Sequence, residues 1–233
     1  MHIGPRYISL GKGLGMNKRS IYIDCAQNMA ELIAGYPAEL TEGVDLHMGD
    51  PTPDELREIV RGYAGVLNGH TVIPNPLLEE NAGTLRTVVF LGTGVPNYVD
   101  PAAGEMLGIK VRHITGYGDR SIAEHAFALL LAAARGIGQM DREVRSGIWQ
   151  SFEGVELAGK TLGVVGTGAV GSELIRIADV FGLNCLAWNR SGVDPSLPCR
   201  EAKLEEIFRE ADAVSLHIAY TSETHEMVDD PLL

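Results

Sequence analysis

Cysteines, basic residues and long apolar runs are all scarce in this sequence. The three cysteines, Cys25, Cys185 and Cys199, include no CxxC pair, and their odd number favours reduced thiols over a disulfide framework. The seven histidines form neither an HExxH motif nor a His/Cys cluster at zinc spacing, so no metal site is expected. No apolar run reaches the length of a membrane span, and no signal-peptide pattern opens the chain, which favours a cytoplasmic protein without a membrane partner.

Charge and length narrow the possibilities further. With 19 Lys and Arg against 31 Asp and Glu, the net charge of −12 argues against nucleic acid as a main partner, because phosphate binding needs clustered bases. The 233 residues are enough for two modest domains. We place a substrate domain at residues 16–114 and a nucleotide-binding domain at 115–233. Residues 1–15 are glycine-rich and basic without periodicity, which indicates a disordered arm or a misassigned start.

From Ser20 onward, short apolar runs alternate with helical patterns, which is typical of a parallel α/β sheet. In the first domain this predicts a flavodoxin-like fold, with strands at 20–25, 44–48, 64–69, 86–94 and 110–116 and helices at 29–40, 52–63 and 101–107. Thr52 and Glu55 have capping-box spacing, and Pro53 suits the first turn.

The candidate substrate contacts follow two neighbouring strands of this domain. Ligands of such sheets bind beyond the carboxyl ends of the strands. That edge holds two short segments, Asn68, Gly69 and His70, and Gly92, Thr93 and Gly94. Backbone amides exposed by the glycines are expected to bind a carboxylate. Plain surface turns are the alternative.

A long apolar helix is predicted from Ser121 to Met140, with Ser121 and Glu124 as a capping box. It is apolar almost all round, so it must be covered on most sides. Its charged continuation runs to Trp149. A subunit or inter-domain contact over residues 121–149 is one interpretation, and a core helix within one chain is the other.

The segment GTGAVG lies between an apolar strand at 160–165 and a helix at 172–182. In the dinucleotide-binding fingerprint, Gly166 allows a tight turn, Gly168 lets the backbone approach a pyrophosphate, and Gly171 lets the helix pack against the strand. The pyrophosphate would lie at the helix N-terminus, where free amides and the dipole favour an anion. The candidate cofactor contacts in this turn are Gly166, Thr167, Gly168, Ala169, Val170 and Gly171.

The second strand of this unit lacks the carboxylate that NAD-binding units place about 20 residues past the glycines. Asn189, Arg190 and Ser191 stand there instead. A carboxylate would repel the 2′-phosphate of NADP, whereas Arg190 would pair with it. The sequence therefore favours NADP over NAD. The alternative is a simple turn in which Asn189 serves the backbone.

The last part of the chain predicts a helix at 203–211 and a strand at 212–218, which we take as the third strand of the unit. His217 and Ile218, at its end, are then expected beside the adenosine half of the cofactor. Without a fourth strand, the strand at 161–165 has no partner on its second edge, which is an aggregation hazard. This incomplete Rossmann sheet is therefore expected to be poorly stable.

Three segments, residues 91–137, 147–171 and 204–228, jointly resemble the D-isomer-specific 2-hydroxyacid dehydrogenase family, and the resemblance extends from Ser20 to Leu233. It implies a split substrate domain, a Rossmann cofactor domain and a homodimer formed through the region matched by residues 121–149. The implied chemistry is hydride transfer between NADP or NAD and a small 2-keto or 2-hydroxy acid. In the family, an Arg binds the substrate, a His is the general acid and base, and a Glu orients that His.

The family's catalytic Arg, Glu and His lie downstream of the segment matched by residues 217–233, so no catalytic residue is expected in this chain. Neither His125 nor His217 is expected to act as a replacement. Asn189 replaces the usual Asp, as in members similar to NADP-dependent glyoxylate/hydroxypyruvate reductases. Two alternatives stay open: a non-catalytic, dimerising nucleotide-binding remnant, and an adenosylmethionine-dependent methyltransferase, whose cofactor also binds a glycine-rich turn.

Overall fold

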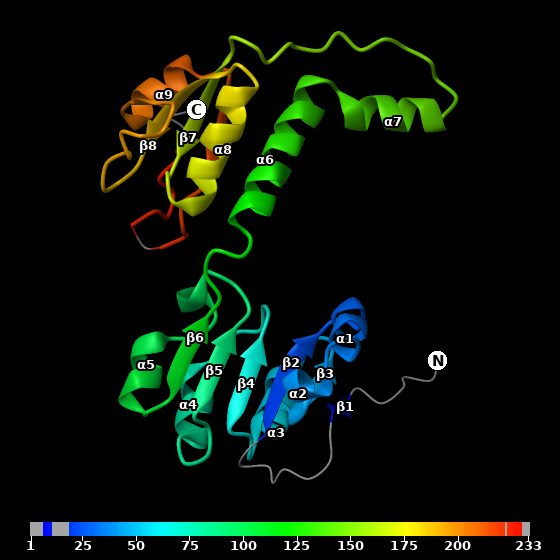
Figure 1. Cartoon of the computed structure of the whole chain (residues 1–233), viewed down its shortest axis with the longest axis vertical. Helices are drawn as coiled ribbons and strands as arrows, with labels where there is room; N and C mark the ends of the chain where they lie inside the picture. Colours follow the sequence, from blue (N-terminus) through cyan, green and yellow to red (C-terminus); the bar gives the residue numbers. More distant parts are fainter. Residues whose placement is uncertain (1–6, 11–18, 222, 230–233) are drawn as a thin grey trace. The chain divides into compact units, whose positions relative to one another are not determined.

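The computed structural model describes residues 7–10, 19–221 and 223–229. The chain divides into two compact units, Met1–Thr115 and Gly116–Leu233, and each contains a sheet with helices packed on it (Figure 1). None of the helices in these described segments is long and apolar enough to cross a membrane.

The first unit contains a six-stranded sheet in the order β1-β3-β2-β4-β5-β6. Its strands are β1 (Tyr7–Leu10), β2 (Ser20–Cys25), β3 (Val44–Met48), β4 (Gly65–Asn68), β5 (Thr87–Phe90) and β6 (Lys110–His113). Its helices are α1 (Gln27–Ala34), α2 (Ala38–Thr41), α3 (Pro53–Val60), α4 (Asn75–Asn81) and α5 (Pro101–Met106). Strands β2 to β6 are parallel and have the strand order of a flavodoxin-like sheet, which confirms the expected fold class.

The N-terminal segment differs from the expectation of a disordered arm. Residues 7–10 form β1, which pairs antiparallel with β3. This pairing satisfies backbone groups that the edge of β3 would otherwise expose. The rest of the expected arm, residues 1–6 and 11–15, lies outside the described residues.

The helix expected at 29–40 is interrupted. Helix α1 ends at Ala34 and α2 begins at Ala38, because Pro37 has no N–H for the helical ladder and disfavours helical backbone in the residue before it. The capping box of α3 is confirmed. The Glu55 N–H donates to Thr52 Oγ1 at 3.3 Å, and the Thr52 N–H donates to Glu55 Oε2 at 2.8 Å.

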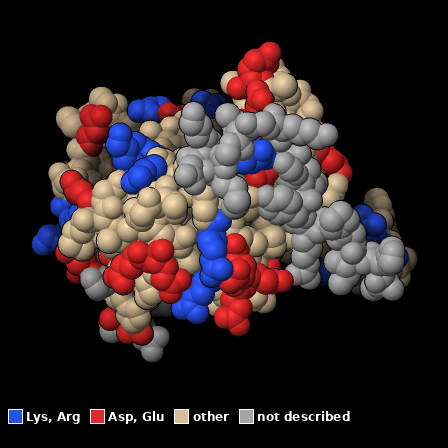
Figure 2. All heavy atoms as spheres, turned by 90° about the horizontal axis from the view of Figure 1, so that it is seen from below, with Lys and Arg blue, Asp and Glu red and all other residues tan. Residues whose placement is uncertain are grey.

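A buried ionic group lies in the sheet of the first unit. Asp45 on β3 accepts hydrogen bonds from Arg19 Nε at 3.0 Å and from the Tyr63 hydroxyl at 2.7 Å, and its side chain is only 2% exposed. Acidic and basic side chains are also interspersed over the molecular face in Figure 2. Exposed pairs such as Arg61 with Glu58 contribute little to stability. Loss of the buried pair of Arg19 with Asp45 is therefore expected to cost more stability than loss of a surface pair.

The second unit contains a four-stranded parallel sheet in the order β10-β7-β8-β9. Its strands are β7 (Thr161–Val165), β8 (Asn184–Trp188), β9 (Arg200–Glu201) and β10 (Ala213–Leu216), and its helices are α6 (Asp119–Ala134), α7 (Ile137–Arg145), α8 (Ala169–Val180) and α9 (Leu204–Glu210). Helices α6 and α8 pack on one face of this sheet, and α9 packs on the other.

The expectation that the strand at 161–165 lacks a second partner is wrong. Strand β7 pairs with β8 on one side and with β10 on the other. The third strand of the unit is the two-residue β9, and the strand at 213–216 is the fourth, placed across β7. Because β7 is almost completely buried, its backbone groups need partners on both edges, and β10 supplies the second set.

Helix α6 also differs from the prediction. It begins at Asp119 rather than at a Ser121 cap, and the Ser121 hydroxyl donates to the Gly118 carbonyl at 3.0 Å. Gly136, with φ of 61°, separates α6 from α7. The expected cover on most sides is not present within the described chain, because only Ala123 and Phe127 of α6 are buried.

Candidate functional site: a cleft at the glycine turn

The turn after β7 has the backbone geometry of a nucleotide-binding glycine turn. Gly166 has φ of 94°, and a Cβ there would lie 2.5 Å from the carbonyl oxygen of His217. A Cβ on Gly171 would lie 2.0 Å from the carbonyl oxygen of Gly166. Glycine is therefore needed at both positions, for the turn and for close helix packing. A Cβ at Gly168 would meet no atom within 4 Å, so the backbone there is open to a ligand.

Helix α8 begins directly behind this turn. Gly168 is its N-cap residue, and no side chain caps the first turn. Backbone N–H groups and the helix dipole at such a start favour an anion. The Ser172 hydroxyl donates to the Thr167 carbonyl at 2.9 Å, which holds the turn against the helix. The open Gly168 and the uncapped helix start therefore fit a pyrophosphate group.

The turn opens into a cleft of about 510 Å³ at the carboxyl ends of β7, β8 and β10. Strand β8, which follows β7 in the chain, lies on one side of β7, and β10 lies on the other. The strand order therefore reverses at β7, and open α/β sheets bind ligands at such a switch point. Six of the residues predicted from the sequence line the cleft together: Gly166, Gly168, Asn189, Arg190, His217 and Ile218. The other predicted cofactor residues adjoin them in the turn, at the start of α8 and after Arg190: Thr167, Ala169, Val170, Gly171 and Ser191.

Asn189 joins the glycine turn to the loop that follows β8. Its Oδ1 accepts the Thr167 N–H at 3.3 Å, while its Nδ2 donates to Ser191 Oγ at 2.9 Å and to the Gly192 carbonyl at 3.0 Å. A carboxylate at this position would keep the first bond and lose the donation to Gly192, because it has no donor. The neutral amide therefore serves the loop itself, whatever cofactor binds.

Arg190 already has a partner in the cleft. It forms an ion pair with Glu223, and the two side chains are 81% and 69% exposed. Glu223 also lines the cleft, so a phosphate that reaches Arg190 meets a competing carboxylate. Sequence reasoning missed Glu223, because it lies 33 residues from Arg190 and belongs to no motif that signals a contact.

His217 lies in a different place from the one expected. It follows β10, the fourth strand, so it lies beside the turn after β7 instead of at the end of the third strand. Its Nε2 is 2.9 Å from the Ser215 hydroxyl, and burial lowers the pKa of the imidazole. His217 is therefore uncharged at neutral pH, and it lines the cleft as a hydrogen-bonded side chain. His125 is exposed on α6 and does not line the cleft.

The candidate substrate segments follow β4 and β5, which are neighbours in the first sheet. The Leu91 N–H donates to the Asn68 carbonyl at 2.8 Å and joins them. The backbone amides of Gly69 and His70, however, each donate to the buried Asp24 carboxylate at 2.8 Å. The expectation that these two amides bind a substrate carboxylate is therefore wrong, because Asp24 occupies them.

The remaining residues of these two segments differ in how accessible they are to a ligand. Asn68 is fully buried, and its Nδ2 donates to the Thr71 carbonyl at 2.9 Å, so it shapes the turn. Thr93 is exposed, and Gly92 approaches the Phe90 ring too closely for a side chain, since a Cβ would lie 2.6 Å away. A Cβ at Gly94 would meet only Asn97 Nδ2, at 3.6 Å.

His70 is an exposed titratable residue of the first of these segments. Its Nε2 is 2.6 Å from Asp50 Oδ1, and its Nδ1 is 3.7 Å from Asp24 Oδ2. The hydrogen bond with Asp50 raises the pKa of His70, although partial burial opposes this. The imidazolium form therefore persists to higher pH than in a free histidine. No group of three or more His, Cys, Asp or Glu in the described segments is arranged to hold a metal ion.

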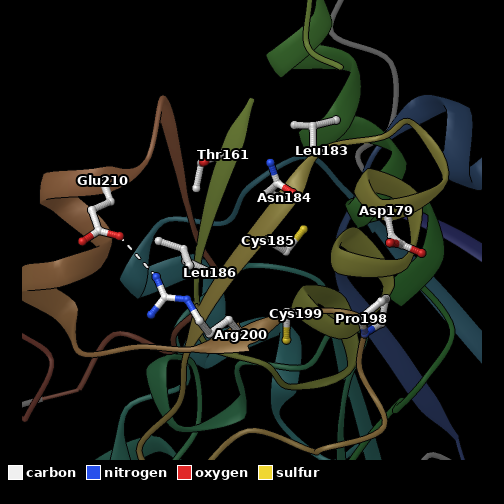
Figure 3. Close-up of a pocket in the computed structure, with 10 residues that line it drawn as sticks. All are labelled: Thr161, Asp179, Leu183, Asn184, Cys185, Leu186, Pro198, Cys199, Arg200 and Glu210. Carbon is white, nitrogen blue, oxygen red and sulfur yellow. Dashed lines mark hydrogen bonds and ion pairs between the residues drawn. The ribbon is translucent and has the colours of Figure 1, made fainter. Parts of the chain in front are cut away.

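A second cavity of the second unit, of about 590 Å³, lies at the other end of the sheet (Figure 3). It is lined by the first residues of two strands, Thr161 and Asn184, and by Cys185 and Cys199. Arg200 lies 3.2 Å from Glu210 there. None of the predicted cofactor residues lines it, so the glycine-turn cleft is the candidate nucleotide site.

The chain is similar to known proteins in both sequence and fold. A family model described as "D-isomer specific 2-hydroxyacid dehydrogenase, NAD binding domain" matches residues 127–233. A hydroxypyruvate reductase of Thermotoga maritima is 31% identical over 179 residues, which cover 76% of this chain and 58% of that protein. A glyoxylate reductase of Aeropyrum pernix is 34% identical over 165 residues, covering 66% of this chain and 49% of that protein.

A solved structure of an acyclic imino acid reductase in complex with NADPH and D-Arg has a similar fold, with a TM-score of 0.80 at 24% identity over 92% of this chain and 70% of that one. The chain thus spans 58% and 49% of the lengths of the two reductases it matches. Together with the matching family model, these similarities show that the chain belongs to the D-isomer-specific 2-hydroxyacid dehydrogenase family.

Proposed function

We propose that the chain binds NADP(H), with NAD(H) as the alternative, in the cleft at the glycine turn, as part of an oxidoreductase of small 2-keto or 2-hydroxy acids. The observation that carries this proposal is the open Gly168 in front of the uncapped start of α8. The cofactor would supply the hydride. Relatives named as hydroxypyruvate and glyoxylate reductases support the substrate class.

Each wall of the cleft has a proposed role toward the cofactor. The backbone at Gly168, Ala169 and Val170 would hold the pyrophosphate. Asn189 and Ser191 would face the ribose. A 2′-phosphate would pair with Arg190 by displacing Glu223, which supports NADP. Glu223 would repel the same phosphate, so NAD stays the alternative.

The first unit is proposed to bind the substrate's carboxylate through the side chain of His70 and the segment Gly92–Gly94. The raised pKa of His70 supports this role, since an imidazolium attracts an anionic keto acid, and the substrate would displace Asp50 from the imidazole. None of the described histidines is proposed as the general acid, because His217 is neutral and bonded to Ser215 and His125 lies outside the cleft. A nucleotide-binding dimer without turnover is the second candidate.

Self-association through residues 121–149 is proposed from the exposed apolar surface of α6, α7 and the segment after them. Leu129 is 59% exposed, Val144 55% and Trp149 90%, which is unusual for apolar side chains in a contiguous segment. A cytoplasmic location is proposed because the three cysteines are free thiols.

Titration with NADPH and NADH, followed by nucleotide fluorescence, tests the proposal. Gly168→Ala places a methyl group where the protein has no atom within 4 Å, so it should abolish binding while leaving the melting temperature nearly unchanged. Gly83→Ala, which also meets no atom within 4 Å, is the matched control and should bind normally. Equal binding by both variants would refute the proposed site.

A further inference from the structure

Two cysteines of the second unit are close to a pair of neighbouring strands: Cys185 lies on β8, and Cys199 comes directly before β9. Strands β8 and β9 are parallel, with Leu186 opposite Arg200. Cys185 and Cys199 each come one residue before this pair, so the register, continued by one residue, would place them opposite each other. Neighbouring strands lie about 4.8 Å apart, within the range of roughly 4.4–6.8 Å that separates the Cα atoms of disulfides.

Their side chains also share one face and one cavity. Cys185 and Cys199 pack in the cluster under α6 and α8, whereas Leu186 packs with α9 on the opposite face. Both cysteines line the cavity drawn in Figure 3. Cys185 is 5% exposed and Cys199 is half-buried, so Cys199 is the thiol that solvent reaches first.

The residues between the two cysteines include the loop of the candidate cofactor site. Asn189, Arg190 and Ser191 all lie between Cys185 and Cys199. A bond between the two sulfur atoms would therefore close a covalent ring around this loop. It would also fix β9, a two-residue edge strand, to β8.

We propose that Cys185 and Cys199 are a redox pair that peroxide oxidises, at alkaline pH, to a reversible disulfide around the loop at 189–191. The peroxide oxidises the Cys199 thiol to a sulfenic acid and releases one water. The Cys185 thiol then attacks that sulfur, the S–S bond forms, and the sulfenic oxygen leaves as a second water. The two thiols together lose two protons and two electrons, and one hydrogen peroxide is reduced to two waters.

The environment of the pair sets the conditions for this reaction. Burial, with a smaller contribution from Cys199, raises the pKa of Cys185 to about 11, and burial also raises the pKa of Cys199. Since the thiolate is the nucleophile, both thiols stay protonated at neutral pH and react faster as the pH rises. The Cβ atoms of a disulfide lie about 3.5–4.5 Å apart, closer than the strands, so the strained bond should be readily reduced.

The direct test is thiol counting and peptide mapping of the whole chain after treatment with hydrogen peroxide at mildly alkaline pH. The expected result is the loss of two of the three alkylatable thiols and a peptide cross-linked between Cys185 and Cys199, both reversed by dithiothreitol. Cys185→Ser and Cys199→Ser should each abolish the cross-link. Cys25→Ser is the matched control and should leave it intact, because Cys25 is buried in the other unit.

Retention of all three thiols, or oxidation of Cys199 without a cross-link, would overturn the proposal. A second arm rests on the proposed function: because closure restricts the loop before the cofactor arrives, NADPH should bind the oxidised chain at least about twofold more tightly. A disulfide with unchanged NADPH affinity would overturn the effect on the loop. A disulfide with no NADPH binding in either redox state would instead refute the proposed function.

Discussion

Replacing Asp24 with asparagine is expected to destabilise the first unit by about 3–5 kcal/mol. One carboxylate oxygen accepts the Gly69 N–H at 2.8 Å, and the other accepts those of His70 and Thr71 at 2.8 and 2.7 Å. An asparagine oxygen can replace only one of the two, and its NH₂ group then faces a backbone N–H. The unpaired N–H costs about 1–3 kcal/mol, and each remaining bond loses roughly 1 kcal/mol when the charge is removed.

Urea unfolding followed by two signals checks this value. Both tryptophans, Trp149 and Trp188, lie in the second unit, so their fluorescence reports that unit, while far-ultraviolet circular dichroism reports both. Asp24→Asn should shift only the dichroism transition of the first unit to lower urea. Asp50→Asn, at a carboxylate that is 73% exposed, is the control at a pH above the folded pKa of His70, where it should change stability by less than about 0.5 kcal/mol. A loss below about 1 kcal/mol for Asp24→Asn would refute the reasoning.

Three further changes have defined outcomes. Glu223→Gln should improve NADPH binding several-fold relative to NADH, because it removes the carboxylate that competes for Arg190; titrations at low and high salt should show the gain shrinking as charges are screened. Asp50→Asn should lower the pKa of His70, observed by NMR. Since the folded pKa of His70 is raised, the stability it contributes is present below its unfolded pKa of about 6.5 and is lost as the pH rises through the folded value. Trp149→Ser should shift the chain toward monomer in analytical ultracentrifugation, and an unchanged sedimentation profile would argue against the proposed contact.

The glycine turn is the part of the site that the sequence predicts best. Gly171 is required by its contact with the Gly166 carbonyl within the turn, and Gly166 by its positive φ, although a Cβ on Gly166 would also meet the distant His217 carbonyl. The local constraints leave a recognisable spacing in the sequence. The flavodoxin-like strands are predictable for a similar reason, because buried parallel strands are continuous apolar runs. Local rules also explain the capping box of α3.

The strand order of the second unit could not be read in the same way. Strand β9 consists of Arg200 and Glu201, which carry no apolar pattern, so the next apolar run at 213–216 resembles a third strand. Only pairing with β7 shows it to be the fourth. Hydrogen bonds between residues far apart in the chain also leave no pattern in the sequence. Asp24 lies 45 residues from Gly69, and no motif near either residue predicts the hydrogen bond between them.

Both sheets reverse their strand order at one point, and these two points differ in the charge that meets the backbone donors. In the first unit the reversal lies between β2 and β4, where successive N–H groups of residues 69–71 donate to the buried Asp24 carboxylate. In the second unit it lies between β7 and β10, where α8 starts without a side-chain cap and Gly168 leaves the space in front of it open. An internal anion thus satisfies the first set of donors, whereas no side chain caps the second among the residues that the structure describes. Similar topology therefore gives a closed structural turn in one unit and the proposed site for an external anion in the other.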